Sequence, residues 1–155
     1  MVCAEAVSPR DTLQVENLMA RDVFHDAVRH ALIRDGWTIT DDPYTFESRD
    51  FPLQIDLGAE RLIAATKENE RIAVEVKSFI SSSAISEFHT ALGQYLNYRL
   101  ALSIEDPNRL LFLAVPSDAF QVFFQRPLPT RIINEYHLSL IVYDPEEESI
   151  EQWIS

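Results

Sequence analysis

The chain has very few of the residues that build several common kinds of active site. Its one cysteine, Cys3, can form neither an internal disulfide nor a thiolate metal cluster. Its three glycines, Gly36, Gly58 and Gly93, are too few and too scattered for a phosphate-binding loop or a dinucleotide-binding fingerprint. The four histidines do not have the spacing of a zinc site. These absences exclude several large enzyme classes.

Long apolar runs are also absent. No run approaches the roughly 20 residues that a membrane-spanning helix needs, and the N-terminus has no charged-then-apolar signal pattern. We therefore expect a cytoplasmic protein with no membrane partner.

Basic residues are scarce as well. The chain has 13 Lys and Arg residues against 25 Asp and Glu residues, a formal net charge of -12, and it has no basic run. A protein that binds nucleic acid alone normally carries a basic face that neutralises phosphates. Any role on DNA therefore needs a small local basic patch or a basic partner that delivers the nucleic acid.

The remaining composition is that of one ordinary globular domain. The 155 residues are 46% hydrophobic and 25% charged, enough for a core and too few for two domains. Residues 1–18 lack periodicity and contain Ser8-Pro9, so we predict a flexible N-terminal extension there. Residues 19–155 are predicted to form a single domain.

Two helices are indicated by apolar residues that recur every three or four positions. The first begins at Asp22, a candidate N-cap, and is ended by Gly36, which suits the left-handed conformation found after helices. The second begins after the Ser83 cap and runs to about Leu102. Two shorter helices are predicted over residues 117–124, with Ser117 as cap, and 131–136, with Pro127 and Pro129 ending the first.

Strands are indicated by alternation of apolar and polar residues. Gly58 is predicted to end the strand at 53–57, and the polar residues 67–70 to form a hairpin loop between strands at 62–66 and 71–77. The apolar run 110–115 is typical of a strand buried on both faces. Further strands are predicted at 37–40, 44–46, 138–143 and 150–154. The expected fold class is α/β (α+β): a helix, a three-stranded antiparallel sheet, a second helix and further strands in a mixed central sheet.

The candidate site comes from this strand pattern. In residues 72–77, Glu75 and Lys77 project from the same face, and Asp56 stands on the polar face of its own strand. Two carboxylates suit a hard divalent cation, so we expect Asp56, Glu75 and the backbone carbonyl of Val76 to bind Mg²⁺ or Mn²⁺. Lys77 would orient or deprotonate the attacking water in phosphodiester hydrolysis. The predicted catalytic residues are these side chains together with Gln94.

Each of these interpretations has a simpler alternative. A Glu-x-Lys triplet alone is a weak signal. In the simpler interpretation, Glu75 and Lys77 form an exposed ion pair on an edge strand, which contributes little. Gln94, placed on the second helix to contact the metal's water shell or a phosphate, would be an ordinary helix-surface glutamine. His25, beside the apolar stripe of the first helix, would be a partly buried histidine bonded to backbone rather than a group facing the site.

Several segments of the chain also carry a family resemblance. They are residues 21–25, 31–37, 56–60, 72–79 and 91–95. From Met19 onward the chain resembles the XisH family, the cyanobacterial fdxN element excision controlling factors. The resemblance implies a restriction-endonuclease-like fold with a PD-(D/E)xK site at Asp56, Glu75 and Lys77. In Holliday-junction-resolvase relatives of that fold a glutamate occupies the first helix, where this chain has His25.

The resemblance also implies partners and a process, and it leaves three functions open. XisH proteins are implied to act beside a small companion, XisI, in programmed excision of a DNA element during heterocyst differentiation. The first function is a magnesium-dependent endonuclease-fold factor acting on DNA. The second, favoured by the acidic charge, is a catalytically silent module that assembles XisI and a site-specific recombinase. The third is a toxin-like nuclease held by its companion. The oligomeric state stays open, with a dimer among the alternatives.

Overall fold

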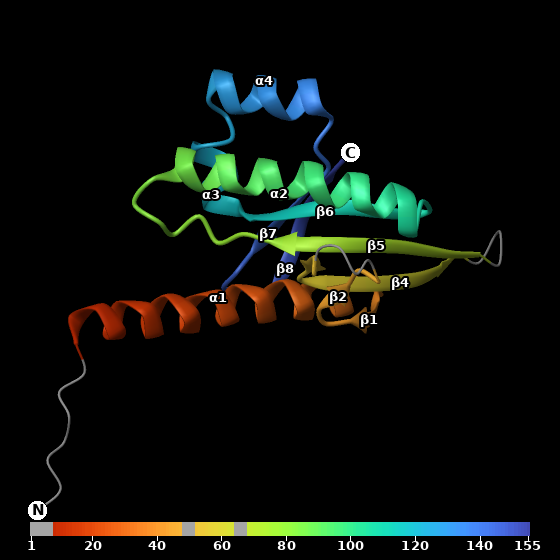
Figure 1. Ribbon diagram of the computed structural model, residues 1–155, viewed down its shortest axis with the longest axis horizontal. Helices are drawn as coiled ribbons and strands as arrows, with labels where there is room; N and C mark the ends of the chain where they lie inside the picture. Colours follow the sequence, from red (N-terminus) through yellow and green to blue (C-terminus); the bar gives the residue numbers. More distant parts are fainter. Residues whose placement is uncertain (1–7, 48–51, 64–67) are drawn as a thin grey trace, which may run out of the picture.

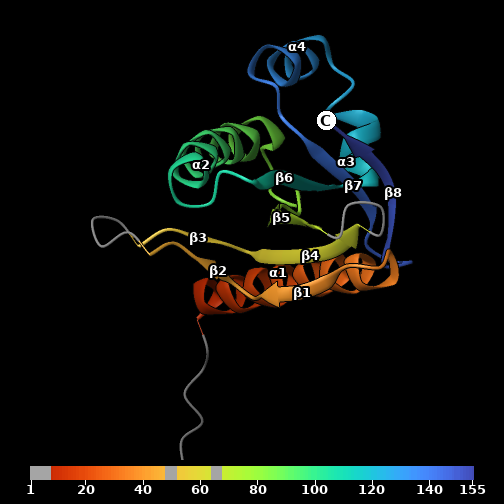
Figure 2. The ribbon, with the colours of Figure 1, turned by 90° about the vertical axis from the view of Figure 1, so that its right-hand side faces the viewer.

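The protein is a layered α/β structure in which the main sheet separates one long helix from three other helices (Figure 1). The computed structural model describes residues 8–47, 52–63 and 68–155. Figure 1 shows α1 (Pro9–Arg34) on one face of the sheet and α2 (Ala84–Glu105), α3 (Ser117–Val122) and α4 (Pro127–Tyr136) on the other. The same layers are visible from the side in Figure 2.

The main sheet is mixed, as predicted. Its six strands run in the order β1-β4-β5-β6-β7-β8, and β5, β6 and β7 are parallel while the remaining pairs are antiparallel. Their bounds are Thr38–Asp41 for β1, Leu57–Ile63 for β4, Glu68–Val76 for β5, Arg109–Pro116 for β6, Leu140–Asp144 for β7 and Ser149–Ile154 for β8. The strands β2 (Tyr44–Thr45) and β3 (Gln54–Ile55) form a separate two-stranded sheet. The mixed α/β class is therefore confirmed, and its three-stranded antiparallel part is formed by β1, β4 and β5 rather than with the strand predicted at 53–57.

The alternation of side chains in β5 explains the two cores. Ile72 and Val74 are fully buried in a cluster with Val28 of α1, whereas Ala73 is buried in a cluster with Phe88 of α2. Burying one such aliphatic or aromatic side chain contributes about 1.5–3 kcal/mol. The two covered faces fix the register of β5, because a slip by one residue would exchange the two sets of side chains.

The first helix begins earlier than predicted. It starts at Pro9, with the Ser8 side chain accepting a hydrogen bond from the Asp11 backbone N–H at 3.2 Å, so Asp22 lies inside the helix and is not its N-cap. None of the described side chains between residues 8 and 23 is buried, which explains why no apolar period marked this half. Figure 1 shows it extending past the sheet. Residues 1–7 of the expected extension lie outside the described residues.

The predicted ends of several other elements also need correction. The strand expected at 53–57 is interrupted at Asp56, and Gly58 lies inside β4 rather than after a strand. A Cβ at Gly58 would stand 2.8 Å from the Asp41 carboxylate, so close approach explains this glycine. Residues 68–70 belong to β5 and not to a loop, whereas 64–67 lie outside the described residues.

Some of the predicted helix ends are wrong and others are confirmed. Pro127 begins α4 instead of ending a helix, which is consistent with the preference of proline for the first helical position. Ser117 makes no capping bond at the start of α3. The Ser83 prediction is confirmed, because its side chain accepts from the Ser86 backbone N–H at 3.3 Å and α2 begins at the next residue. Gly36 ends α1 with a φ of +92°, also as expected.

Candidate metal centre

Two carboxylates meet where β4 begins and β5 ends. Asp56 lies at the bend between β3 and β4, and its Oδ2 accepts a hydrogen bond from the Val76 backbone N–H at 2.8 Å. In return, the Asp56 backbone N–H donates to Oε2 of Glu75 at 3.3 Å. These reciprocal bonds join two strands and hold both acidic side chains in one place.

Lys77 follows directly after β5 and completes this group. Its backbone N–H donates to the Ala114 carbonyl at 2.9 Å, and its carbonyl accepts from the Tyr143 hydroxyl at 2.9 Å. The Lys77 Nζ lies 3.6 Å from Oε1 of Glu75, and the side chains are only 15% and 8% exposed. Because β5 lies between β4 and β6, the pair is not the exposed edge-strand pair of the simpler interpretation.

The electrostatics of Glu75 are unusual for a glutamate. Burial, and after it the negative charge of Asp56, raises its pKa to about 7, while Lys77 lowers this pKa only in part. The same two carboxylates also contribute, after burial, to raising the pKa of Tyr98 to about 12. One lysine therefore does not compensate the two carboxylates, and the site favours an additional cation.

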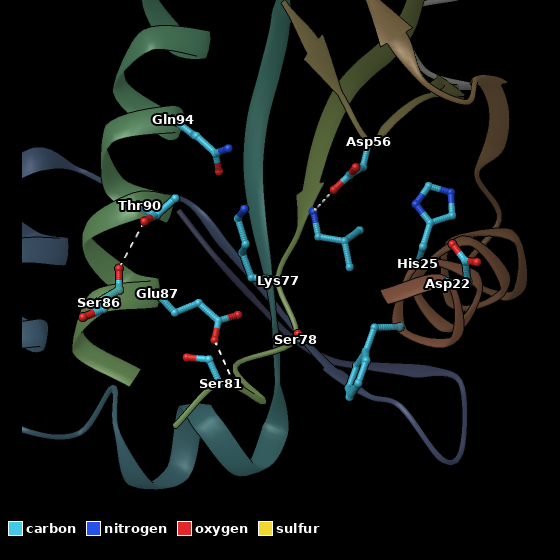
Figure 3. A pocket seen from close by; sticks show the side chains of 12 residues that line it. Asp22, His25, Asp56, Lys77, Ser78, Ser81, Ser86, Glu87, Thr90 and Gln94 are labelled. Atoms are coloured by element: carbon cyan, nitrogen blue, oxygen red, sulfur yellow. Dashed lines mark hydrogen bonds between the residues drawn. The ribbon is translucent and has the colours of Figure 1, made fainter. Parts of the chain in front are cut away.

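A pocket of about 700 Å³ opens beside these groups. Figure 3 shows Asp22 and His25 on the α1 side, Ser86, Thr90 and Gln94 on the α2 side, and Lys77 between them. The lining residues are Asp22, Phe24, His25, Asp56, Val76, Lys77, Ser78, Ser81, Ser86, Glu87, Thr90 and Gln94. Glu75 does not line the pocket.

Gln94 lies in the α2 wall of the pocket and has a buried amide oxygen, Oε1, without a hydrogen-bond partner among the described residues. A buried amide oxygen without a partner costs about 1–3 kcal/mol, so such an atom usually marks a position for water, an ion or a ligand. This is not the environment of an ordinary helix-surface glutamine.

Sequence reasoning missed the rest of the α2 wall. This wall contains Ser86, Thr90 and Gln94, which are spaced four residues apart and so lie on one face of the helix. The same spacing is visible in the sequence and would have identified them. Glu87 also faces the pocket, and its carboxylate accepts from the backbone N–H of Phe79 at 2.8 Å and of Ser81 at 3.4 Å.

Glu87 therefore fixes the loop that leaves β5. Phe79 in this loop has a φ of +52°, a left-handed conformation that costs a non-glycine residue about 1 kcal/mol or more. The pair of hydrogen bonds to Glu87 stabilises that conformation and keeps the loop at the mouth of the pocket. No sequence pattern pointed to this role.

His25 lies on the opposite wall. Its Nε2 is 2.8 Å from Oδ1 of Asp42, so its partner is a side chain and not the backbone that the simpler interpretation assumed. Asp42 lies between β1 and β2, outside every element that the sequence singled out for the site.

The donor set suits a hard divalent cation. Among the described residues, no three His, Cys, Asp or Glu side chains form a group able to hold a metal ion. A cation here would therefore be held by the carboxylates of Asp56 and Glu75, the Val76 carbonyl and water. All of these are oxygen ligands, the set that Mg²⁺ and Mn²⁺ prefer. The uncompensated charge at Glu75 and the unpaired Gln94 oxygen both fit such an occupant.

Comparison with known proteins identifies the family. A model of the family described as XisH protein matches residues 18–151, which is most of the chain. The chain belongs to the XisH family. A crystal structure of an XisH family protein from Nostoc punctiforme is 50% identical, has a TM-score of 0.79, and covers 86% of this chain and 100% of its own.

A second XisH-type structure is equally similar. It is an fdxN element excision controlling factor protein from Anabaena variabilis, with 51% identity and a TM-score of 0.79, covering 87% of this chain and 100% of its own. No curated protein matches this XisH-family chain. Among its described residues, no helix combines the length and apolar character needed to cross a membrane.

Proposed function

We propose that this XisH-family protein is a divalent-metal-dependent phosphodiesterase of the restriction-endonuclease-like type, which acts on DNA in the control of element excision. The observation that carries the proposal is the half-buried Asp56 joined by reciprocal hydrogen bonds to the buried Glu75, beside a pocket of about 700 Å³ that Asp56 and Lys77 line. The excision role is taken from the Anabaena relative, which is described as an excision controlling factor.

Each residue has a distinct role in this proposal. Bound Mg²⁺ would supply Lewis-acid activation of the phosphodiester and of water. Asp56, Glu75 and the Val76 carbonyl bind the cation and set its position. Lys77, whose backbone is fixed at both ends, orients the attacking water and offsets charge in the transition state, and it could accept the proton of that water only in its neutral form. The unpaired Gln94 oxygen would accept a hydrogen bond from water held in the site.

The acidic chain favours assistance by a partner. The formal net charge of -12 opposes the approach of DNA, whose binding normally depends on cationic contacts to phosphates. We infer that a basic companion of the XisI type delivers the nucleic acid. The same charge supports a second candidate function, in which the protein does not cut and instead assembles the companion and a site-specific recombinase.

Metal binding is the first test. Calorimetric titration with Mg²⁺ and Mn²⁺ should show one site in the wild type that is lost in Glu75→Gln and Asp56→Asn. Glu70→Gln is a matched control, because Glu70 lies on the same strand and pairs with Arg61 away from the pocket. Absence of binding in the wild type would remove the basis of the enzyme proposal.

Cleavage separates the two candidates. Duplex, branched and single-stranded DNA and RNA should be incubated with the protein and Mg²⁺, with and without the companion. We expect divalent-dependent cleavage that is lost in Lys77→Met, a variant that keeps most of the side-chain volume and removes the charge. Metal binding without cleavage of any substrate would favour the assembly role, and cleavage that survives in Lys77→Met would contradict the proposed site.

A further inference from the structure

Among the described residues, the α1 wall of the pocket offers one side-chain hydrogen-bond donor. Asp22, Phe24 and His25 line this wall. An ionised carboxylate only accepts and a phenyl ring does neither, so only the His25 imidazole can donate to an anion. The other lining groups include Lys77 and the hydroxyls and amide of α2, which Figure 3 shows across the pocket from His25.

The geometry of His25 leaves one ring nitrogen available. Its Nε2 lies 2.8 Å from Oδ1 of Asp42, and Oδ2 of the same carboxylate lies 3.2 Å from Nε of Arg29. Because the carboxylate only accepts, Nε2 carries the proton of this bond. No other hydrogen bond reaches the ring within the part of the chain that the structure describes. The side chain is 25% exposed, so a ligand in the pocket can reach it.

The charge of the pocket favours a cationic donor at this ring nitrogen. Among the described lining residues, the three carboxylates of Asp22, Asp56 and Glu87 outnumber the one lysine, Lys77. A phosphodiester would add a further negative charge, and Lys77 can offset it only on its own side. A cationic donor on the α1 side would complete the compensation.

We propose that His25, oriented by Asp42, binds the phosphodiester from the α1 wall: the ring takes up a proton from solvent, and Nδ1–H donates a hydrogen bond to a phosphate oxygen opposite Lys77. This inference rests on the proposed function, because it takes the ligand to be a phosphodiester. Asp42 acts as a positioning residue through His25. Arg29 holds the second carboxylate oxygen and keeps Asp42 in place.

The test is nitrogen NMR of the histidine rings. The full-length protein saturated with Mg²⁺ is titrated with the dinucleotide thymidylyl-thymidine, the smallest DNA phosphodiester, and His25→Gln assigns the His25 signals. We expect the Nδ1 signal of His25 to move to the protonated position, and the affinity for the dinucleotide to fall about tenfold in His25→Gln. His30→Gln is the matched control, because His30 lies on the same helix but pairs with Glu148 and does not line the pocket.

The role of Asp42 is tested by the tautomer of the His25 ring. In Asp42→Asn, the His25 ring should lose its fixed Nε2–H tautomer, which the same spectra report directly. The dinucleotide should then bind about as weakly as it does to His25→Gln, and Asp42→Glu should recover part of the affinity. An unchanged tautomer in Asp42→Asn would remove Asp42 from the proposal.

Three results would overturn the role of His25. If Mg²⁺ alone moves Nδ1 and the dinucleotide adds nothing, His25 is a metal ligand. If the dinucleotide binds and Nδ1 does not move, His25 does not contact the phosphate. Failure of the dinucleotide to bind at millimolar concentration also refutes the inference. The proposed function fails separately, when Asp56 and Glu75 do not bind metal or cleavage persists without Lys77.

Discussion

Glu75 should make the metal-free protein less stable as the pH rises, and replacing it with glutamine should remove that loss. The residue is 6% exposed, and its carboxylate stands beside Asp56 with only Lys77 in compensation. Its pKa is raised from the ordinary value of 4.5 to about 7. Glutamine has nearly the same shape, can still accept from the Asp56 backbone N–H, and never ionises.

The sign and size follow from linkage. Between pH 4.5 and 7 the folded protein holds a proton on Glu75 that the unfolded chain releases. The contribution of this group is therefore fully present below pH 4.5 and is lost as the pH rises through 7. A pKa displacement of this size corresponds to about 3 kcal/mol at most, and to roughly 2–3 kcal/mol between about pH 5 and about pH 8.

The measurement is urea unfolding followed by tryptophan fluorescence, with EDTA present. Trp37 is 3% exposed and should report unfolding clearly. The difference in free energy of unfolding between Glu75→Gln and the wild type should grow by roughly 2–3 kcal/mol from about pH 5 to about pH 8, since only the wild type ionises at position 75. Glu135→Gln, on the exposed face of α4, serves as control. A difference that does not change with pH would refute the reasoning.

Three further predictions concern residues around the site and the fold. Tyr143→Phe keeps the ring packing and removes the hydroxyl that donates to the Lys77 carbonyl, so urea unfolding should show a loss of about 1–3 kcal/mol and cleavage should fall by more than the folded fraction does. Arg109→Met removes a buried guanidinium that bonds the Ile72 carbonyl and the Asp106 carboxylate, while Asp106 keeps its ion pair with Arg71, so urea unfolding should show a loss of about 1–3 kcal/mol. His137→Gly should raise the melting temperature, because His137 ends α4 with a φ of +52°, and glycine removes a cost of about 1 kcal/mol; an unchanged melting temperature would contradict this.

The parts of the fold that could be predicted are those in which burial imposes a period. β5 is covered on both faces, so Ile72 and Val74 alternate with Ala73 and Glu75 in the printed sequence. α2 is covered on one face, and its Ser83 cap is visible as a local signal. The described side chains in the N-terminal half of α1 are exposed, so burial imposes no period on them.

The parts that could not be predicted depend on contacts between distant segments. Asp42 is 17 residues from His25 and meets it only because β1 lies beside α1. Gly58 looked like a strand end, but it is required by the approach of Asp41. The residue types and the strand of Glu75 and Lys77 were available from the sequence. Their burial, and hence the raised pKa of Glu75, required the neighbouring elements.

The interruption at Asp56 has a mechanical consequence. The chain leaves the small β2-β3 sheet and enters the large one at this residue, and its carboxylate and amide are both anchored to β5. Asp56 is therefore the joint between two separately paired strands. A partner that moved the β2-β3 hairpin would pull on the bend that carries this carboxylate, and the geometry offered to a cation would change with it.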